Sequence, residues 1–139
     1  MLNFFKKKNK EIIENPVAKI AALLIHVAKI DESYTQKERE IIKKAIVELG
    51  VKNEMIDNVI KKAEEIENNS NQILDFTKEV KNMDENRKIQ IVETLWQIIY
   101  SNKEADIYEA NLMRRLGGLL YIDNKIMGDI KEKIKKENS

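Results

Sequence analysis

Apolar residues recur along most of the chain at intervals of three and four positions, which places them on one face of an α-helix. This pattern predicts a succession of helices rather than strands. The predicted helices cover residues 16–30, 35–49, 53–66, 70–80, 84–100 and 106–118, and a last helix begins after residue 123. We therefore predict an all-α fold of about seven helices.

Residues that cap helices stand at the predicted boundaries. Thr35 with Glu38, and Asp106 with Glu109, each form a capping-box pair whose side chains satisfy backbone groups of the first helical turn. Gly50 is expected to end the 35–49 helix, because glycine readily adopts the left-handed conformation common at helix C-termini. The other predicted N-terminal caps are Asn15, Asn53, Ser70, Asp84 and Asp123.

The chain also repeats itself. Thr35 and Asp106 open the two capping boxes and lie 71 positions apart, and apolar residues such as Leu24 and Leu95 match at the same separation. This agreement predicts a duplicated unit of three helices. We call residues 17–66 the first unit and residues 88–137 the second unit, with a helix over about 70–82 connecting them.

A unit of three amphipathic helices exposes an apolar face when it stands alone, so the two units are expected to pack around one shared core. The residues expected to be buried in that core are Leu24, Val27, Ile41, Ala45, Leu95, Ile98, Leu112 and Leu120. Trp96 and Tyr100 are four positions apart and are expected to pack as a pair. The domain is predicted over residues 15–139, preceded by a tail or short helix over 1–14.

Composition supports the helical prediction and narrows the function. Only 4 Gly and 1 Pro occur, which leaves few turn residues for a many-stranded β fold. The absence of Cys excludes thiol nucleophiles, Cys-ligated zinc and disulfides. A net charge of +1 argues against a nucleic-acid partner. The longest apolar run, residues 20–25, is far shorter than the roughly 20 residues of a transmembrane helix, so we expect a cytoplasmic location.

Acidic residues gather where each unit joins its first two helices. We call residues 28–40 the first corner and residues 99–111 the second corner. The first corner carries Asp31 and Glu38, and the second carries Asn102, Glu104 and Glu109. Oxygen ligands crowded at a turn suit a hard cation such as Ca²⁺ or Mg²⁺. These five residues are the predicted metal ligands.

An alternative interpretation needs no ion. With Asp31 as the first position of an EF-hand, Gln36 replaces the turn glycine and Ile42 replaces the closing Glu, so that motif does not match. Carboxylates in the first turn of a helix also stabilise the helix dipole and the capping box by themselves. The acidic residues then act only as helix caps.

The two corners resemble the TerB-like tellurite-resistance domains, over residues 22–42 and 95–122. The family pattern is a helix ending in Ala-x-x-Asp-Gly-Glu, a short loop and a Glu inside the next helix. Asp31, Glu38, Glu104 and Glu109 match its acidic positions, whereas Asn102 stands in place of an Asp. The resemblance implies an all-α domain of tellurite resistance and stress response, with acidic corners that bind a divalent metal.

Three further departures are Glu32 and Lys103 in place of the family's Gly, and Ser33 in place of a Glu. Because each corner has lost part of its charge, we expect it to bind a cation more weakly than a fuller version would.

These observations lead us to expect a non-enzymatic cytoplasmic domain that binds a divalent cation and a protein partner. A partner in a membrane-associated complex is included in this expectation. The alternative is a helical adaptor without a metal site. A third reading, a hydrolase using His26 with Glu38 or Asp31, lacks support, because no Ser-His-Asp or HExxH arrangement occurs. We therefore predict no catalytic residue.

Overall fold

The structure is a computed structural model that describes residues 16–30, 34–70, 73–101 and 107–138. Seven α-helices and one short 3₁₀ turn fall within these residues, and all of their regular elements are helical. After a helix over residues 16–28 come α2 (Gln36–Glu48), η1 (Asn53–Met55), α3 (Ile56–Asn69), α4 (Leu74–Lys81), α5 (Glu85–Tyr100), α6 (Ile107–Leu119) and α7 (Asn124–Glu137). The predicted all-α fold is confirmed.

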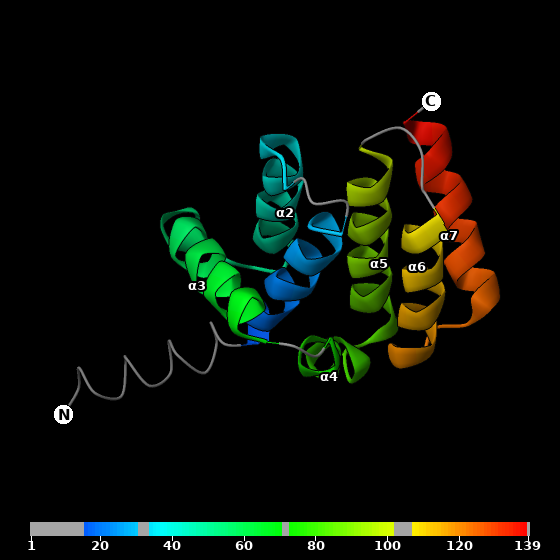
Figure 1. The fold of residues 1–139 in the computed structure, drawn as a ribbon, viewed down its shortest axis with the longest axis horizontal. Coiled ribbons are helices and arrows are strands. Elements are labelled where there is room, and N and C mark those ends of the chain that lie inside the picture. The colour runs from blue at the N-terminus through cyan, green and yellow to red at the C-terminus, as the bar shows by residue number, and fades with distance from the viewer. Residues whose placement is uncertain (1–15, 31–33, 71–72, 102–106, 139) are drawn as a thin grey trace.

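Helix α5 stands at the centre of the molecule (Figure 1). It packs against α7 on one side and α2 on the other, while α2 also packs against α3. Helix α4 crosses the foot of the bundle and contacts α6. The arrangement brings the two predicted units together along α5.

The helix over residues 16–28 supplies the most continuously buried segment. Its run over residues 20–25 is apolar on all sides and almost completely inaccessible to solvent, as expected for a helix surrounded by others. It joins residues of both units, from Ile20 to Ile134, in one contiguous hydrophobic core. The apolar run that is too short to cross a membrane is therefore the centre of the core.

Most of the residues expected in the core are confirmed there. The buried ones are Leu24, Val27, Ala45, Leu95, Ile98 and Leu120. Ile41 and Leu112 are only partly buried, although both pack against the core. These two exceptions lie 71 positions apart, so both predicted units place a partly covered apolar residue at the same point.

The helix boundaries confirm several predicted caps. The Thr35 hydroxyl accepts from the Glu38 backbone N–H at 3.1 Å, and Glu38 Oε1 accepts from the Thr35 backbone N–H at 2.8 Å. Asp84 and Asp123 cap α5 and α7 through their side chains. Gly50 follows α2 with a φ of 102°, in the left-handed region. Asn15 and Asp106 lie outside the described residues.

Two predicted caps are wrong. Ser70 does not open α4, which begins at Leu74; it ends α3 and donates from its hydroxyl to Asp75 at 2.9 Å. Helix α3 continues past residue 66 to Asn69, and Glu67 in its last turn accepts at Oε2 from Lys29 Nζ, just after the 16–28 helix, at 2.7 Å. Asn53 is the first residue of η1 rather than its cap.

Element boundaries agree with the 71-residue offset. Helices α2 and α6 both begin and end 71 positions apart, and η1 and α7 begin 71 positions apart. The division into units over 17–66 and 88–137, and the domain limits, remain predictions that superposition of the helix triplets would test. Residues 1–14 lie outside the described residues.

Candidate functional site

Two of the five predicted metal ligands can be placed. Glu38 lies in the first turn of α2 and Glu109 in the first turn of α6. Both are buried, with exposed fractions of 2% and 7%. Asp31, Asn102 and Glu104 lie outside the described residues. The structure therefore places one predicted carboxylate at each corner.

Glu38 is held by the residue that caps its helix. Its Oε1 accepts hydrogen bonds from the Thr35 backbone N–H at 2.8 Å and from the Thr35 hydroxyl at 2.9 Å. Burying a carboxylate is unfavourable unless such bonds replace water. At the first corner, the capping box thus supplies part of the compensation that burial of Glu38 requires.

Glu109 faces the end of α5. Burial raises the pKa of Tyr100, the last residue of α5, and the negative charges of Glu132 and Glu109 raise it further. Glu38 acts in the same way on Tyr34 beside the first corner. There, burial and then Glu64 raise the pKa to about 12, with Glu38 adding to the effect and Arg39 opposing it. Each buried corner carboxylate therefore has a tyrosine within its electrostatic reach.

Described residues of the two corners contact each other directly. Lys37, in the first turn of α2, donates from Nζ to the backbone carbonyl of Ser101 at 3.2 Å. Ser101 is the C-terminal cap of α5 and directly precedes Asn102. A cation at a helix C-terminus is favourable because it meets the negative end of the dipole. This bond connects the start of the first unit's second helix to the second corner.

The described part of the chain contains no group of three or more His, Asp or Glu side chains arranged to hold a metal ion. It supplies one carboxylate to each corner, and carboxylate oxygen is a suitable donor for a hard cation. A complete site depends on Asp31 at the first corner, and on Asn102 and Glu104 at the second.

A polar cluster that the sequence did not predict joins two residues of the first corner to α3. The Tyr34 hydroxyl, Arg39 Nε and Glu64 Oε1 are buried without a hydrogen-bond partner, although Arg39 and Glu64 approach to 3.4 Å as an ion pair. Arg39 and Glu64 lie on different helices, so no local pattern relates them. Tyr108 at the second corner is 74% exposed.

His26 pairs with a carboxylate other than the two considered from sequence. Its Nδ1 lies 3.4 Å from Glu67 Oε1, and Lys29 binds the second oxygen of the same carboxylate. The imidazole also lies beside the Phe76 ring, with centroids 6.2 Å apart. These contacts connect the 16–28 helix to α3 and give His26 a structural role.

A family model described as tellurite resistance protein TerB matches residues 18–132, which include both corners and nearly all of the described helices. The chain belongs to the TerB family. No curated protein and no solved structure matches this TerB chain. Across the described part of the TerB chain, no helix combines the length and apolar character needed to cross a membrane.

Proposed function

We propose that this TerB chain is a non-catalytic, cytoplasmic domain of tellurite resistance and stress response. In this proposal its acidic corners bind a divalent cation, Ca²⁺ or Mg²⁺, and present the cation-bound face to a protein partner. Family membership supports the general role. The observation that carries the metal site is the burial of one carboxylate, Glu38 or Glu109, at the same position of each corner.

The metal proposal rests on the energetic cost of holding several carboxylates close together in a buried place. Like charges held close together repel, and a cation offsets that repulsion. Glu38 with Asp31 would supply oxygen ligands at the first corner, and Glu109 with Asn102 and Glu104 at the second. Each corner would then offer two carboxylates, and the second would add the amide oxygen of Asn102.

A second candidate is favoured by the Thr35 hydrogen bonds to Glu38. In that case the corner carboxylates act only as helix caps, and the chain is a helical adaptor that needs no ion. In both candidates the chain functions by binding a protein partner. That partner can belong to a membrane-associated complex. The net charge of +1 supports a partner other than nucleic acid.

Titration with Ca²⁺ and with Mg²⁺ separates the two candidates. A ligand that binds only the folded state raises the melting temperature, so the metal proposal predicts a rise for one of these cations. Amide NMR shifts should concentrate at residues 31–38 and 102–109. Asp31→Ala should abolish the part of the rise in melting temperature that is due to the first corner, together with the NMR shifts at residues 31–38. Glu40→Gln is the matched control, because Glu40 is an exposed acid of α2 that bonds to Gln36 within its own helix.

A flat melting temperature without shifts at the corners would remove the metal proposal and leave the adaptor. The biological role is tested separately, by survival in tellurite of sensitive bacteria that express the wild-type chain. Asp31→Ala should reduce survival to the level of the empty vector if the cation is required, and it should leave survival unchanged if the carboxylates only cap helices.

A further inference from the structure

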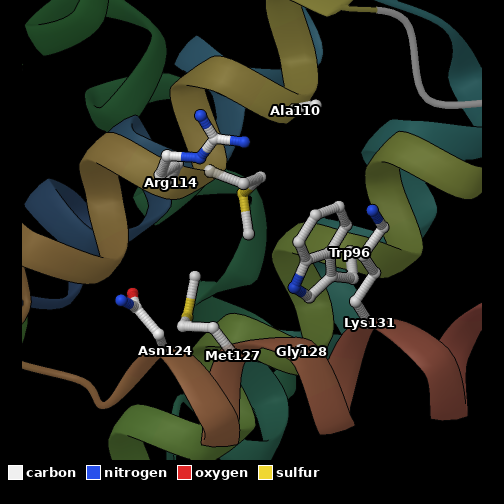
Figure 2. Close-up of a pocket in the computed structure, with 8 residues that line it drawn as sticks. Trp96, Ala110, Arg114, Asn124, Met127, Gly128 and Lys131 are labelled. Carbon is white, nitrogen blue, oxygen red and sulfur yellow. The ribbon is translucent and has the colours of Figure 1, made fainter.

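Helices α5, α6 and α7 enclose a groove of about 250 Å³ in the second unit (Figure 2). Its walls include the buried side chains of Trp96, Met113 and Met127, and Arg114 and Lys131 also line it. This volume is below the range typical of pockets for drug-sized ligands. The groove thus suits a small molecule that is partly apolar.

The groove is positively charged. Arg114 and Lys131 contribute two cationic groups, and no acidic residue lines it. Neither cation forms an ion pair with another residue in the described part of the chain. Lys131 Nζ lies over the Trp96 ring instead, 5.6 Å from its centroid. The groove therefore offers positive charge that its own walls do not neutralise.

Trp96 adds a hydrogen-bond donor without an acceptor. Its side chain is 4% exposed, and its Nε1 is buried without a hydrogen-bond partner. Figure 2 shows this nitrogen directed into the groove, toward Met127. An indole N–H can only donate, and leaving a buried donor unpaired is unfavourable. The unbranched Met127 side chain can change rotamer, so it can admit an acceptor to Nε1.

The first unit has buried apolar residues at the corresponding positions. At the 71-residue offset, Trp96, Met113 and Lys131 correspond to three isoleucines that are almost completely buried, which are Ile25, Ile42 and Ile60. Branched apolar side chains fill the space between the helices of the first unit. The larger, more polar set in the second unit leaves a groove at the equivalent position.

The two units also differ in whether a carboxylate pairs with the cation at this place. Lys43 of the first unit corresponds to Arg114, and its Nζ lies 3.6 Å from Asp57 Oδ1. The position equivalent to Asp57 is Gly128, where an added Cβ would meet no atom within 4 Å. The second unit therefore keeps the cation, lacks the carboxylate and has open space at the position of the missing side chain.

We propose that the groove binds a small organic anion, a carboxylate with a short apolar body. The carboxylate replaces the side chain missing at Gly128 and accepts hydrogen bonds from the Arg114 guanidinium and Trp96 Nε1–H. The positive charge of Lys131 favours the same anion, and the apolar body lies against Met113 and Met127. This site is separate from the corners and does not depend on whether they bind a metal.

Hexanoate is a suitable probe, and the chain reports its binding directly because Trp96 is the only tryptophan. Titration should give a saturable change in fluorescence and a shift of the single indole N–H resonance in NMR. We expect a Kd in the micromolar to millimolar range. Hexan-1-ol has the same apolar body without the charge and should bind about tenfold more weakly or worse, because hydrogen bonds to charged groups are the stronger ones. Inorganic phosphate alone should bind more weakly than hexanoate.

Two variants at one position test the missing carboxylate. Gly128→Asp should place a carboxylate beside Arg114, as in the first unit, and weaken hexanoate binding about tenfold or more. Gly128→Asn has nearly the same size without the charge and should bind within a few fold of wild type. Circular dichroism and melting temperature establish that both variants fold. Trp96→Phe, followed by calorimetry, should also weaken hexanoate binding.

The proposal is overturned if hexanoate gives no saturable change, or if hexan-1-ol binds as tightly as hexanoate. It is equally overturned if phosphate matches hexanoate, since the apolar walls would then contribute nothing. If folded Gly128→Asp binds hexanoate as tightly as wild type, the ligand carboxylate does not lie where the side chain of residue 128 would be, and the proposal is overturned.

Discussion

The first and second units place their helices at equivalent positions but hold them together with different contacts. In the first unit and the α3 residues that directly follow it, ion pairs connect neighbouring segments: Glu67 binds Lys29 and approaches His26, and Lys43 approaches Asp57. In the second unit, aromatic contacts are prominent. The Trp96 and Tyr100 rings stack with centroids 5.8 Å apart, which confirms the predicted pair. At the 71-residue offset, Lys29 corresponds to the ring of Tyr100 and Asp57 to the open position at Gly128. The second unit also has one ion pair between α7 and α5, where Lys133 lies 3.4 Å from Glu93.

The ends of the equivalent helices α2 and α6 show the same divergence. Gly50 and Tyr121 lie 71 positions apart, and both have positive φ values, of 102° and 57°. Glycine adopts this conformation without a steric penalty, whereas a side chain makes it unfavourable by about 1–2 kcal/mol. Lys81 Nζ lies 4.8 Å from the Tyr121 ring centroid, a contact that a glycine would lose. The comparison teaches that equivalent helix ends keep the same backbone conformation even where the second unit replaces glycine by a residue that is less suited to it.

The largest expected effect tests whether the two units share one core. Leu24→Ala and Leu95→Ala remove equivalent, fully buried side chains, so each should lower the free energy of unfolding by about 2–5 kcal/mol. Urea unfolding should be monitored by circular dichroism, which reports on all helices, and by Trp96 fluorescence, which reports on the second unit. Both signals should change together in both variants.

Val47→Ala is the control, because Val47 is exposed on α2 and its loss should change stability by no more than about 0.5 kcal/mol. If Leu24→Ala shifts the transition seen by circular dichroism while Trp96 fluorescence keeps the wild-type midpoint, the units unfold independently and the shared core is wrong.

The next effect belongs to the first unit and appears only at alkaline pH. Burial and then Glu64 raise the pKa of Tyr34 to about 12, against about 10 in the unfolded chain. The folded state therefore holds the phenol proton more tightly. Its contribution to stability is complete below about pH 10 and is lost as the pH rises toward about 12.

Urea unfolding between pH 9 and pH 12 should show this loss, and Tyr34→Phe should make the slope of stability against pH shallower. The absorbance of tyrosinate should show a late ionisation of Tyr34 in the wild type that the variant lacks, whereas the raised pKa of Tyr100 is present in both. An unchanged slope in folded Tyr34→Phe would show that another group causes the alkaline loss.

A moderate effect concerns the cap of the first corner. Thr35→Ala removes the hydroxyl that bonds to Glu38 and to its backbone N–H, so it should destabilise the fold by about 1 kcal/mol. Thr35→Ser keeps the hydroxyl and should stay close to wild type. The difference between the two variants, measured by urea unfolding, should be the same with and without divalent cations if the cap acts alone. A difference that changes with added cation would link the cap to a metal site.

The smallest effect concerns the ion pair between Lys43 and Asp57 in the first unit. Asp57 is 88% exposed, so Asp57→Asn should lower stability by less than about 1 kcal/mol, and high salt should reduce the difference further. A larger loss that persists in high salt would mean that this pair has a structural importance beyond a surface contact.

Local signals in the sequence were sufficient for the helices and for much of the core. The spacing of Leu24 and Leu95 determines their burial, because a helix with one apolar face must cover that face. The capping box at Thr35 and Glu38 was also predictable, since its hydrogen bonds lie within one turn. Ser70 was assigned wrongly because a polar residue between two helices can follow one as readily as it opens the next, and here it follows α3.

The candidate sites were less accessible from sequence. That Glu38 and Glu109 would be buried, and not only cap their helices, depends on how neighbouring helices cover the corners. The groove depends on Trp96, Arg114 and Lys131 meeting from three helices, which no spacing along one helix reveals. A usable signal was nevertheless present at the 71-residue offset, where Ile25 and Ile60 correspond to Trp96 and Lys131.

The central place of α5 has a consequence for fragments of this protein. Helix α5 belongs to the second unit, yet it packs against α2 of the first unit as well as against α7. Proteolytic cleavage between α4 and α5 would therefore leave each fragment with an apolar surface that the other had covered. Such fragments are expected to aggregate when isolated and to recover helical structure when mixed, as complementary pieces do. Truncated forms of this protein should therefore retain the segments on both sides of α4.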